Sequence, residues 1–299
     1  MEENPLRSTV PAAPRPGVPK DPLYQAPAVA WPSLGLFALA LLIWGGALWG
    51  AVEGHLHPAL AVALQTVAAF MQFTVLHDGV HRSLLRGYPR LNDLVAGIGG
   101  SFLGIVGSVT AFRYAHFAHH RYTNETERDP DLWSGTARSP WLLPLHWATA
   151  DLYYALLILR HRARIPAKDQ LAIVGTVALI LGGYATACAL GYGYEATLYW
   201  LLPSRLAILW LACAFNYLPH HPHAVEQSHN PYAATNVRAG GEPLIRWLFL
   251  YQNYHLIHHL FPSVPFYRYR RIWRQRETEF VRLGAPVVRW WQLETSSGH

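Results

Sequence analysis

Four long apolar runs constrain the fold of this 299-residue chain more than any other feature. Each is close to the roughly 20 residues that a helix needs to cross the hydrocarbon core of a bilayer. Short links at 53–58 and 192–195 join the runs in two pairs. The sequence therefore predicts an all-α membrane protein with four transmembrane helices in two hairpins. The runs are Ser33–Val52, Ala59–Leu76, Leu171–Gly191 and Ala196–Phe215.

A fifth apolar segment, 94–112, contains five glycines and lies between polar flanks. Glycine permits a sharp bend, and a re-entrant, membrane-dipping hairpin would keep both flanks on one side of the bilayer. A full crossing would separate the flanks, so we expect the hairpin. The polar stretches that follow, 113–170 and 216–299, are predicted to form a cytoplasmic helical cap.

Charge indicates the orientation of the chain. Only 14% of the residues are charged, against roughly 25% in an average soluble domain. The net charge is +6, and the basic residues lie beside apolar segments, which favours a membrane surface over nucleic acid as partner. The links at 53–58 and 192–195 contain no Lys or Arg, so the positive-inside rule places both termini in the cytoplasm.

Composition also suggests the limits of the domains. Residues 1–30 are rich in Pro and Ala and are predicted to be a disordered tail. The membrane domain is expected over 31–280, with a C-terminal tail over 281–299. The start of the chain does not resemble a secretory signal peptide. Both cysteines fall in apolar runs and are expected to be small core residues without a disulfide.

Histidines gather in groups with helical spacing. One group reads H-x-x-x-H and two read H-x-x-H-H, and a further histidine follows the last apolar run. Side chains at i, i+3 and i+4 share one face of a helix. Each group therefore presents its imidazoles on one side. The histidines are His77 and His81, then His116, His119 and His120, then His255, His258 and His259, and finally His220.

Metal binding explains these groups better than isolated structural roles do. A lone histidine is usually a surface or hydrogen-bonded core residue, but unshared imidazoles beside a membrane repel one another when protonated and cost desolvation energy when neutral. Nine imidazoles exceed the ligands of one ion, so two ions are expected. Imidazole suits zinc, copper, iron or nickel. Asp78, Asp129 and Asp131 can orient ligand rings, although helix capping or solvated charge is the alternative.

The pattern of histidine boxes around paired hairpins resembles the membrane fatty-acid desaturase and hydroxylase superfamily, over roughly residues 70–270. The resemblance implies two iron ions held by these histidines, with O2 as co-substrate and no catalytic side chain beyond the metal centre. It also implies that Asn216 contributes through a water molecule. The short first box, with three residues between His77 and His81, differs from the longer spacing of the acyl-CoA branch.

Three further stretches, 122–131, 216–223 and 253–265, are similar to bacterial and cyanobacterial carotene ring hydroxylases. The resemblance implies O2-dependent oxidation of C–H bonds in a long apolar lipid, most simply hydroxylation of β-carotene rings, at a bacterial inner membrane. Related acyl-lipid desaturases share much of these stretches, so a fatty acid desaturase is the alternative. Haem cytochromes and metal transporters are disfavoured because they place their ligands within the spans, whereas these histidines flank them.

Electrons must come from another protein. The sequence has no Rossmann-type glycine motif after a strand, no haem domain and no cysteine cluster. A separate donor such as a ferredoxin or a cytochrome b5-like protein is therefore expected. The arginines of 268–276 offer either a docking face for an acidic donor or an anchor to anionic lipid.

Overall fold

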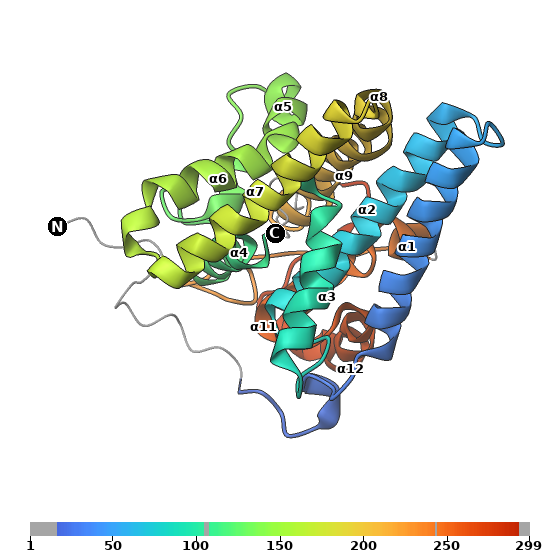
Figure 1. Cartoon of the computed structure of the whole chain (residues 1–299). Helices are drawn as coiled ribbons and strands as arrows, with labels where there is room; N and C mark the ends of the chain where they lie inside the picture. The colour runs from blue at the N-terminus through green and yellow to red at the C-terminus, as the bar shows by residue number, and fades with distance from the viewer. Residues whose placement is uncertain (1–16, 105–107, 243, 293–299) are drawn as a thin grey trace. The chain divides into compact units, whose positions relative to one another are not determined.

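The computed structural model describes residues 17–104, 108–242 and 244–292 of the chain (Figure 1). Within these residues the chain is mostly helical and forms two compact units. We call the unit of residues 28–113 and 151–210 the membrane-helix unit. The histidine unit comprises the described residues up to 27, together with 114–150 and those from 211 onwards.

Four helices of the described chain are long and apolar enough to cross a membrane, as the sequence predicted. Proline stands in the first turn of α1 and begins α2, a position where its missing N–H costs no helical hydrogen bond. No residue of α7 is buried, which suits a helix surrounded by lipid. The four are α1 (Trp31–Val52), α2 (Pro58–Val80), α7 (Ala167–Ala189) and the continuous run Gly193–Tyr217.

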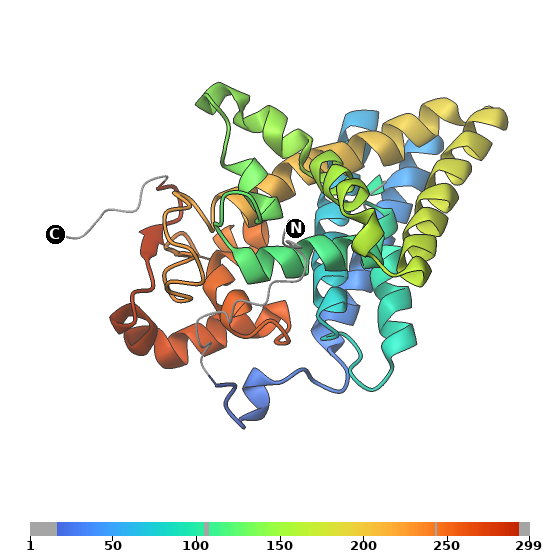
Figure 2. The same ribbon diagram turned by 90° about the vertical axis from the view of Figure 1, so that its left-hand side faces the viewer.

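Small side chains allow the helices of the membrane-helix unit to approach closely. Helix α1 lies along α2 in both views (Figures 1 and 2), and Ala47, Ala61 and Val62 pack there with Tyr199. The run Gly193–Tyr217 consists of α8 (Gly193–Ala196), the π-helix η6 (Thr197–Leu201), α9 (Leu202–Leu211) and the π-helix η7 (Ala212–Tyr217). Trp210 of α9 stacks on Phe70 of α2, with ring centroids 4.0 Å apart.

The segment 94–112 folds back on itself, as expected for a re-entrant hairpin. Helix α3 (Pro89–Ser101) runs antiparallel to α2, because Gly79 of α2 lies opposite Ala96 while Gln72 lies opposite Gly99. The chain turns after α3 at Gly104, whose φ of +71° favours glycine. It then enters α4 (Val109–Tyr122); residues 105–107 lie outside the described residues.

An ion pair shows that the two ends of this segment lie together. Arg113 of α4 contacts Asp93 of α3 at 2.9 Å, and its Nε donates to the carbonyl of Val80 at 3.3 Å. Arg82 also pairs with Asp93, at 3.0 Å. The polar flanks on either side of 94–112 are therefore neighbours, which a full crossing of the bilayer would prevent.

The stretch 113–170, which looks polar in the sequence, contains helices that hydropathy alone did not reveal. Helix α5 (Leu143–Ala148), preceded by η4 (Pro140–Leu142), and α6 (Ala150–Arg160) together form a broken apolar pair that would count as a fifth span or a re-entrant loop. Within the membrane-helix unit, Asp151 at the start of α6 pairs with Arg205 of α9 at 2.6 Å. The short turn η5 (Arg162–Arg164) follows.

The histidine unit consists of short elements joined by hydrogen-bonded loops. Its two strands, β1 and β2, pair in parallel with Val237 opposite Val287. Helices α11 and α12 pack against each other, and their orange and red ribbons lie close together in Figures 1 and 2. The elements are η1 (Pro22–Tyr24), most of α4, η3 (Pro130–Ser134), η4, α5, η7, β1 (Val237–Ala239), α10 (Leu244–Phe249), η8 (Gln252–Tyr254), α11 (His255–Leu260), η9 (Phe266–Arg268), α12 (Tyr269–Arg282) and β2 (Val287–Arg289).

A buried arginine connects distant parts of this unit. Arg238 of β1 is 1% exposed, and its guanidinium donates to the carbonyl of Leu218 at 2.7 and 3.0 Å and to that of Gln292 at 2.7 Å. These bonds compensate for the cost of burying the charge. They also fix the turn after η7, in which His220 lies two residues beyond Leu218.

Residues 17–27, the part of the histidine unit that precedes the membrane helices, pack against its later elements. Tyr24 is buried and packs edge-on against Phe261 with ring centroids 4.9 Å apart. Arg268 donates to the carbonyls of Pro22 and Gln25 at 2.9 and 2.8 Å. Residues 1–16 and 293–299 lie outside the described residues, and the predicted limits 1–30, 31–280 and 281–299 stay predictions.

The contact between α2 and α3 gives a testable prediction. A Cβ added at Gly79 would overlap the Cβ of Ala96, so Gly79→Ala should destabilise the protein by about 1–3 kcal/mol. Gly46→Ala in α1 is the matched control, because no described atom lies within 4 Å of its added Cβ. Thermal unfolding in detergent measures both variants. Equal melting temperatures for Gly79→Ala and wild type would show that the two helices do not meet closely here.

Candidate metal centre

Two short helical stretches and one turn carry the seven predicted ligand histidines that lie in the histidine unit. His116, His119 and His120 lie in the last two turns of α4. The third box forms α11, a helix of six residues in which every side chain is buried. His220 follows the π-helix η7, in the turn held by Arg238. All seven imidazoles are at most 5% exposed, so they lie in an environment where an unshared polar atom is costly.

One group of imidazoles has the geometry of a metal site. His119, His220, His255 and His259 each offer a ring nitrogen, and these four atoms lie within 4.8 Å of one another. The Nε2 atoms of His119 and His259 are 3.2 Å apart. The residues come from α4, α11 and the turn after η7, so three separate stretches of chain converge there.

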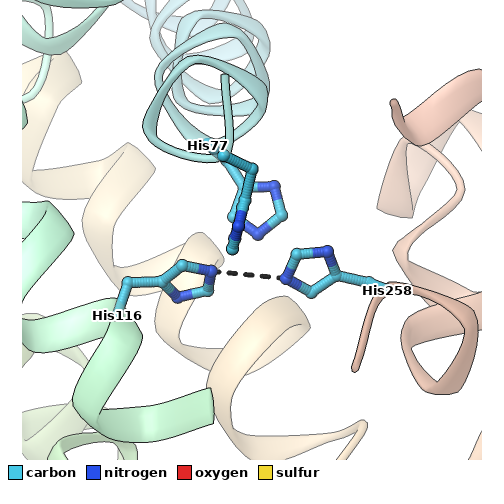
Figure 3. A group of neighbouring side chains, drawn as sticks. His77, His116 and His258 are labelled. Carbon is cyan, nitrogen blue, oxygen red and sulfur yellow. Dashed lines mark hydrogen bonds between the residues drawn. The ribbon is translucent and has the colours of Figure 1, made fainter. Parts of the chain in front are cut away.

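Three further imidazoles of the histidine unit, those of His116, His120 and His258, form a second group. The Nε2 atom of His120 is 3.1 Å from that of His116 and 2.7 Å from that of His258, and the latter two are 3.3 Å apart. Figure 3 shows the rings of His116 and His258 pointing toward each other. Two nitrogens bound to one ion at about 2.1 Å and at a right angle lie about 3.0 Å apart. The observed spacing thus fits imidazoles that share an ion.

The opposite ring nitrogen, Nδ1, is held in four of these histidines by an oxygen atom. Amide and carboxylate oxygens only accept hydrogen bonds, so Nδ1 carries the proton and Nε2 keeps the lone pair that a metal needs. Tyr269 can act as donor or acceptor. The pairs are His119 with Asp129 at 2.7 Å, His255 with Gln252 at 2.9 Å, His258 with Tyr269 at 3.0 Å and His259 with Gln227 at 3.1 Å.

Asp129 combines the two roles that the sequence left open. Its Oδ1 accepts from His119 Nδ1 and from the backbone N–H of Asp131 at 2.9 Å, which caps η3. Its Oδ2 accepts from the N–H of Asn124 at 2.7 Å. Asp131 lies 3.5 Å from His119 Nδ1. Asp78, in the membrane-helix unit, accepts from the hydroxyl of Ser33 at 2.7 Å.

The acidic pair makes His119 electrostatically different from its neighbours. Burial lowers the pKa of His119, but Asp131 and Asp129 outweigh this effect and raise the pKa to about 9. Burial and the surrounding imidazoles hold the pKa values of His220 and His259 well below the usual 6.5. Without metal, the ring of His119 is therefore positively charged beside the two carboxylates, whereas the rings of His220 and His259 are neutral.

The other predicted site residues lie at the ends of membrane helices. His77 is in the last turn of α2 and His81 is its C-cap, with ring centroids 5.4 Å apart. The pair belongs to the membrane-helix unit. Asn216 is buried in η7, four residues before His220.

Three of the residues that hold these imidazole rings were not predicted from the sequence, namely Gln227, Gln252 and Tyr269. Gln252 precedes His255 by three residues, a helical spacing that could have signalled it. Gln227 and Tyr269 reach His259 and His258 through tertiary contacts, for which the sequence gives no local signal. The arrangement as a whole can bind transition metal ions through imidazole, which suits iron, zinc, copper and nickel.

Gln227 offers a test of ring orientation. Besides holding His259, its amide donates to the carbonyl of His120 at 2.7 Å, so it connects the second and third boxes. We expect Gln227→Leu to lower the affinity for Fe(II) about 10–100-fold, measured by competition with a chelator. Ser228→Ala is the control, since that hydroxyl bonds to Glu226. Unchanged affinity in a folded Gln227→Leu protein would exclude this role.

Comparison with known proteins confirms the resemblance to the fatty-acid desaturase and hydroxylase superfamily. The family model described as fatty acid desaturase matches residues 53–291. The β-carotene ketolases of two Paracoccus strains are 30% and 29% identical, each over 80% of this chain and over 94% and 91% of their own lengths. Dihydrorhizobitoxine desaturase of Bradyrhizobium elkanii is 26% identical over 71% of this chain and 64% of its own length. The chain is a membrane oxidoreductase that belongs to the fatty acid desaturase family.

Proposed function

We propose that this protein holds two iron ions and uses O2 to oxidise a ring C–H bond of a carotenoid. The observation that carries the proposal is the convergence of Nε2 atoms from α4, α11 and the turn after η7 into two buried groups. The proposed ligands are His77, His81, His116, His119, His120, His220, His255, His258 and His259, with Asn216 acting through water.

The iron pair, when bound, would supply the O2 chemistry that breaks an unactivated C–H bond. The chain's own residues orient the ligand rings through Asp129, Gln227, Gln252 and Tyr269, with Asp131 close to His119. They also bury the site, which excludes water that would otherwise react in place of the substrate. One hydroxylation consumes O2, two electrons and two protons and releases one water molecule.

An apolar cavity supports a long hydrocarbon as substrate. It encloses about 480 Å³ within the membrane-helix unit, between the start of α4 and helices α6 and α7. Ala111, Ile158, Val174 and Val177 are among its lining residues. Ala111 lies five residues before His116 on the same helix, which is about 7.5 Å of helical rise. Such a cavity favours an isoprenoid or acyl chain over a polar substrate.

The similarity to β-carotene ketolases favours the carotenoid. We propose hydroxylation as the first oxidation; a second oxidation at the same carbon would convert the alcohol to a ketone. Desaturation of an acyl lipid is the second candidate, because the chain is also similar to an acyl-lipid desaturase.

Location and electron supply complete the proposal. The basic residues of the polar regions, and the absence of Lys and Arg from the links at 53–58 and 192–195, support cytoplasmic termini. The similarity to bacterial proteins favours a bacterial inner membrane as the location. The chain has no cofactor motif for delivering electrons, so a ferredoxin or a cytochrome b5-like protein would reduce the iron.

Expression in a bacterium that makes β-carotene tests this function. We expect new hydroxylated or ketolated carotenoids by chromatography and mass spectrometry, and His119→Ala should abolish them. His229→Ala is the matched control, because that side chain is 76% exposed. New double bonds in the fatty acids, with unchanged carotenoids, would favour the desaturase. Full product formation by His119→Ala would contradict the assignment of the site.

A further inference from the structure

A cleft lined by arginines lies in the histidine unit, outside the metal centre. It encloses about 480 Å³ between the segment before α11 and the first turns of α12. We call it the arginine cleft. Its lining residues are Tyr251, Tyr267, Arg270, Arg271, Arg274 and Gln275.

The arginines of this region differ in whether their charge is already compensated. Arg270 pairs with Glu242 at 2.8 Å, and Arg276 pairs with Glu279. The guanidinium of Arg268 donates to backbone carbonyls of the segment before α1. Arg271 and Arg274 are exposed and have no acidic partner among the described residues. The cleft therefore presents two uncompensated positive charges.

Helix α12 connects this cleft to the metal centre. Its buried face includes Tyr269, whose hydroxyl lies 3.0 Å from Nδ1 of the proposed ligand His258. Arg271 and Arg274 follow Tyr269 by two and five residues, so they lie within about 7.5 Å of it along the helix axis. An anionic protein bound at these arginines would therefore contact the helix whose first residue, Tyr269, hydrogen-bonds to the proposed ligand His258.

On the basis of the function proposed above, we propose that the arginine cleft docks an acidic one-electron carrier protein that reduces the metal centre. The reaction requires an external reductant. Hydroxylation takes two electrons from the C–H bond of the substrate and two from the carrier, which delivers them one at a time, together with two protons from solvent. Each docked carrier is oxidised by one electron and then leaves.

The geometry favours a protein partner over an anionic lipid. Guanidinium groups bind carboxylates in a bidentate manner, and Tyr251 and Tyr267 add the aromatic surface typical of protein interfaces. The arginines surround a concavity, into which an acidic protrusion fits. Opposite charge raises the association rate of such transient complexes and makes it sensitive to salt.

The test uses the full-length, iron-loaded protein in nanodiscs and a reduced [2Fe–2S] ferredoxin as the probe. We expect Arg271→Glu/Arg274→Glu to lower the second-order rate of ferredoxin oxidation, followed by stopped flow without O2, about tenfold or more. The dependence of this rate on salt should also weaken. Arg138→Glu/Arg282→Glu is the matched control, because it reverses the same charge at two exposed residues of the histidine unit outside the cleft.

Two readouts separate this inference from the function on which it rests. Product formed in a single turnover with dithionite needs no carrier and should be equal in wild type and Arg271→Glu/Arg274→Glu. If wild type formed no product with dithionite, the proposed function would be contradicted. Slower oxidation of ferredoxin by Arg271→Glu/Arg274→Glu than by wild type would still locate the docking site.

Nanodiscs of neutral and of anionic phospholipid distinguish a docked carrier protein from an anionic lipid in the cleft. An unchanged rate of ferredoxin oxidation in Arg271→Glu/Arg274→Glu would overturn the proposal. If anionic phospholipid also raised the melting temperature of wild type but not of the variant, the cleft would be a lipid headgroup site. An equal loss of the ferredoxin oxidation rate in Arg138→Glu/Arg282→Glu would also overturn the proposal, because the change in net charge alone would then account for the slower rate.

Discussion

The convergence of buried imidazole nitrogens is the interaction on which the rest of this structure depends. Three Nε2 atoms lie 2.7–3.3 Å from one another in one group, and a second group of four ring nitrogens lies within 4.8 Å. Lone pairs at these separations repel unless a proton or a cation lies between them. Burial and the neighbouring imidazoles lower the pKa values of His220 and His259, so protonation of these two rings is unfavourable. Shared metal ions would relieve both costs, and the surrounding chain keeps the nitrogens in place.

That support comes from outside the histidine boxes. Asp129, Gln252 and Gln227 accept from Nδ1 of three rings, and this selects the tautomer whose Nε2 faces inward. Arg238 fixes the turn after η7 through the carbonyl of Leu218, and therefore also the backbone that leads to His220. These groups limit the rotation of the rings before any ion binds. A preorganised site of this kind would bind metal without the cost of ordering its ligands.

The sequence was sufficient for the features that depend on local periodicity. Apolar runs of about 20 residues predicted the four membrane helices, and the glycines of 94–112 predicted a hairpin whose ends meet at Asp93 and Arg113. Helical spacing placed the imidazoles of each box on one face. Tertiary contacts could not be predicted from the sequence. Gln227 and Tyr269 are 32 and 11 residues from the rings that they hold, and nothing in their local sequence marks them. The apolar α6 was missed because it has only 11 residues, with Asp151 in its first turn and Arg160 in its last.

The metal content of the purified protein tests the central claim most directly. Protein isolated from iron-replete cells should contain two iron ions per chain, and X-ray absorption should show a nitrogen-rich coordination shell at about 2.1 Å. Substituting His259 should remove iron while leaving the membrane helices folded. A well-folded protein that binds no iron under these conditions, or that binds it mainly through carboxylate oxygens, would contradict the claim that these imidazoles form a two-iron centre.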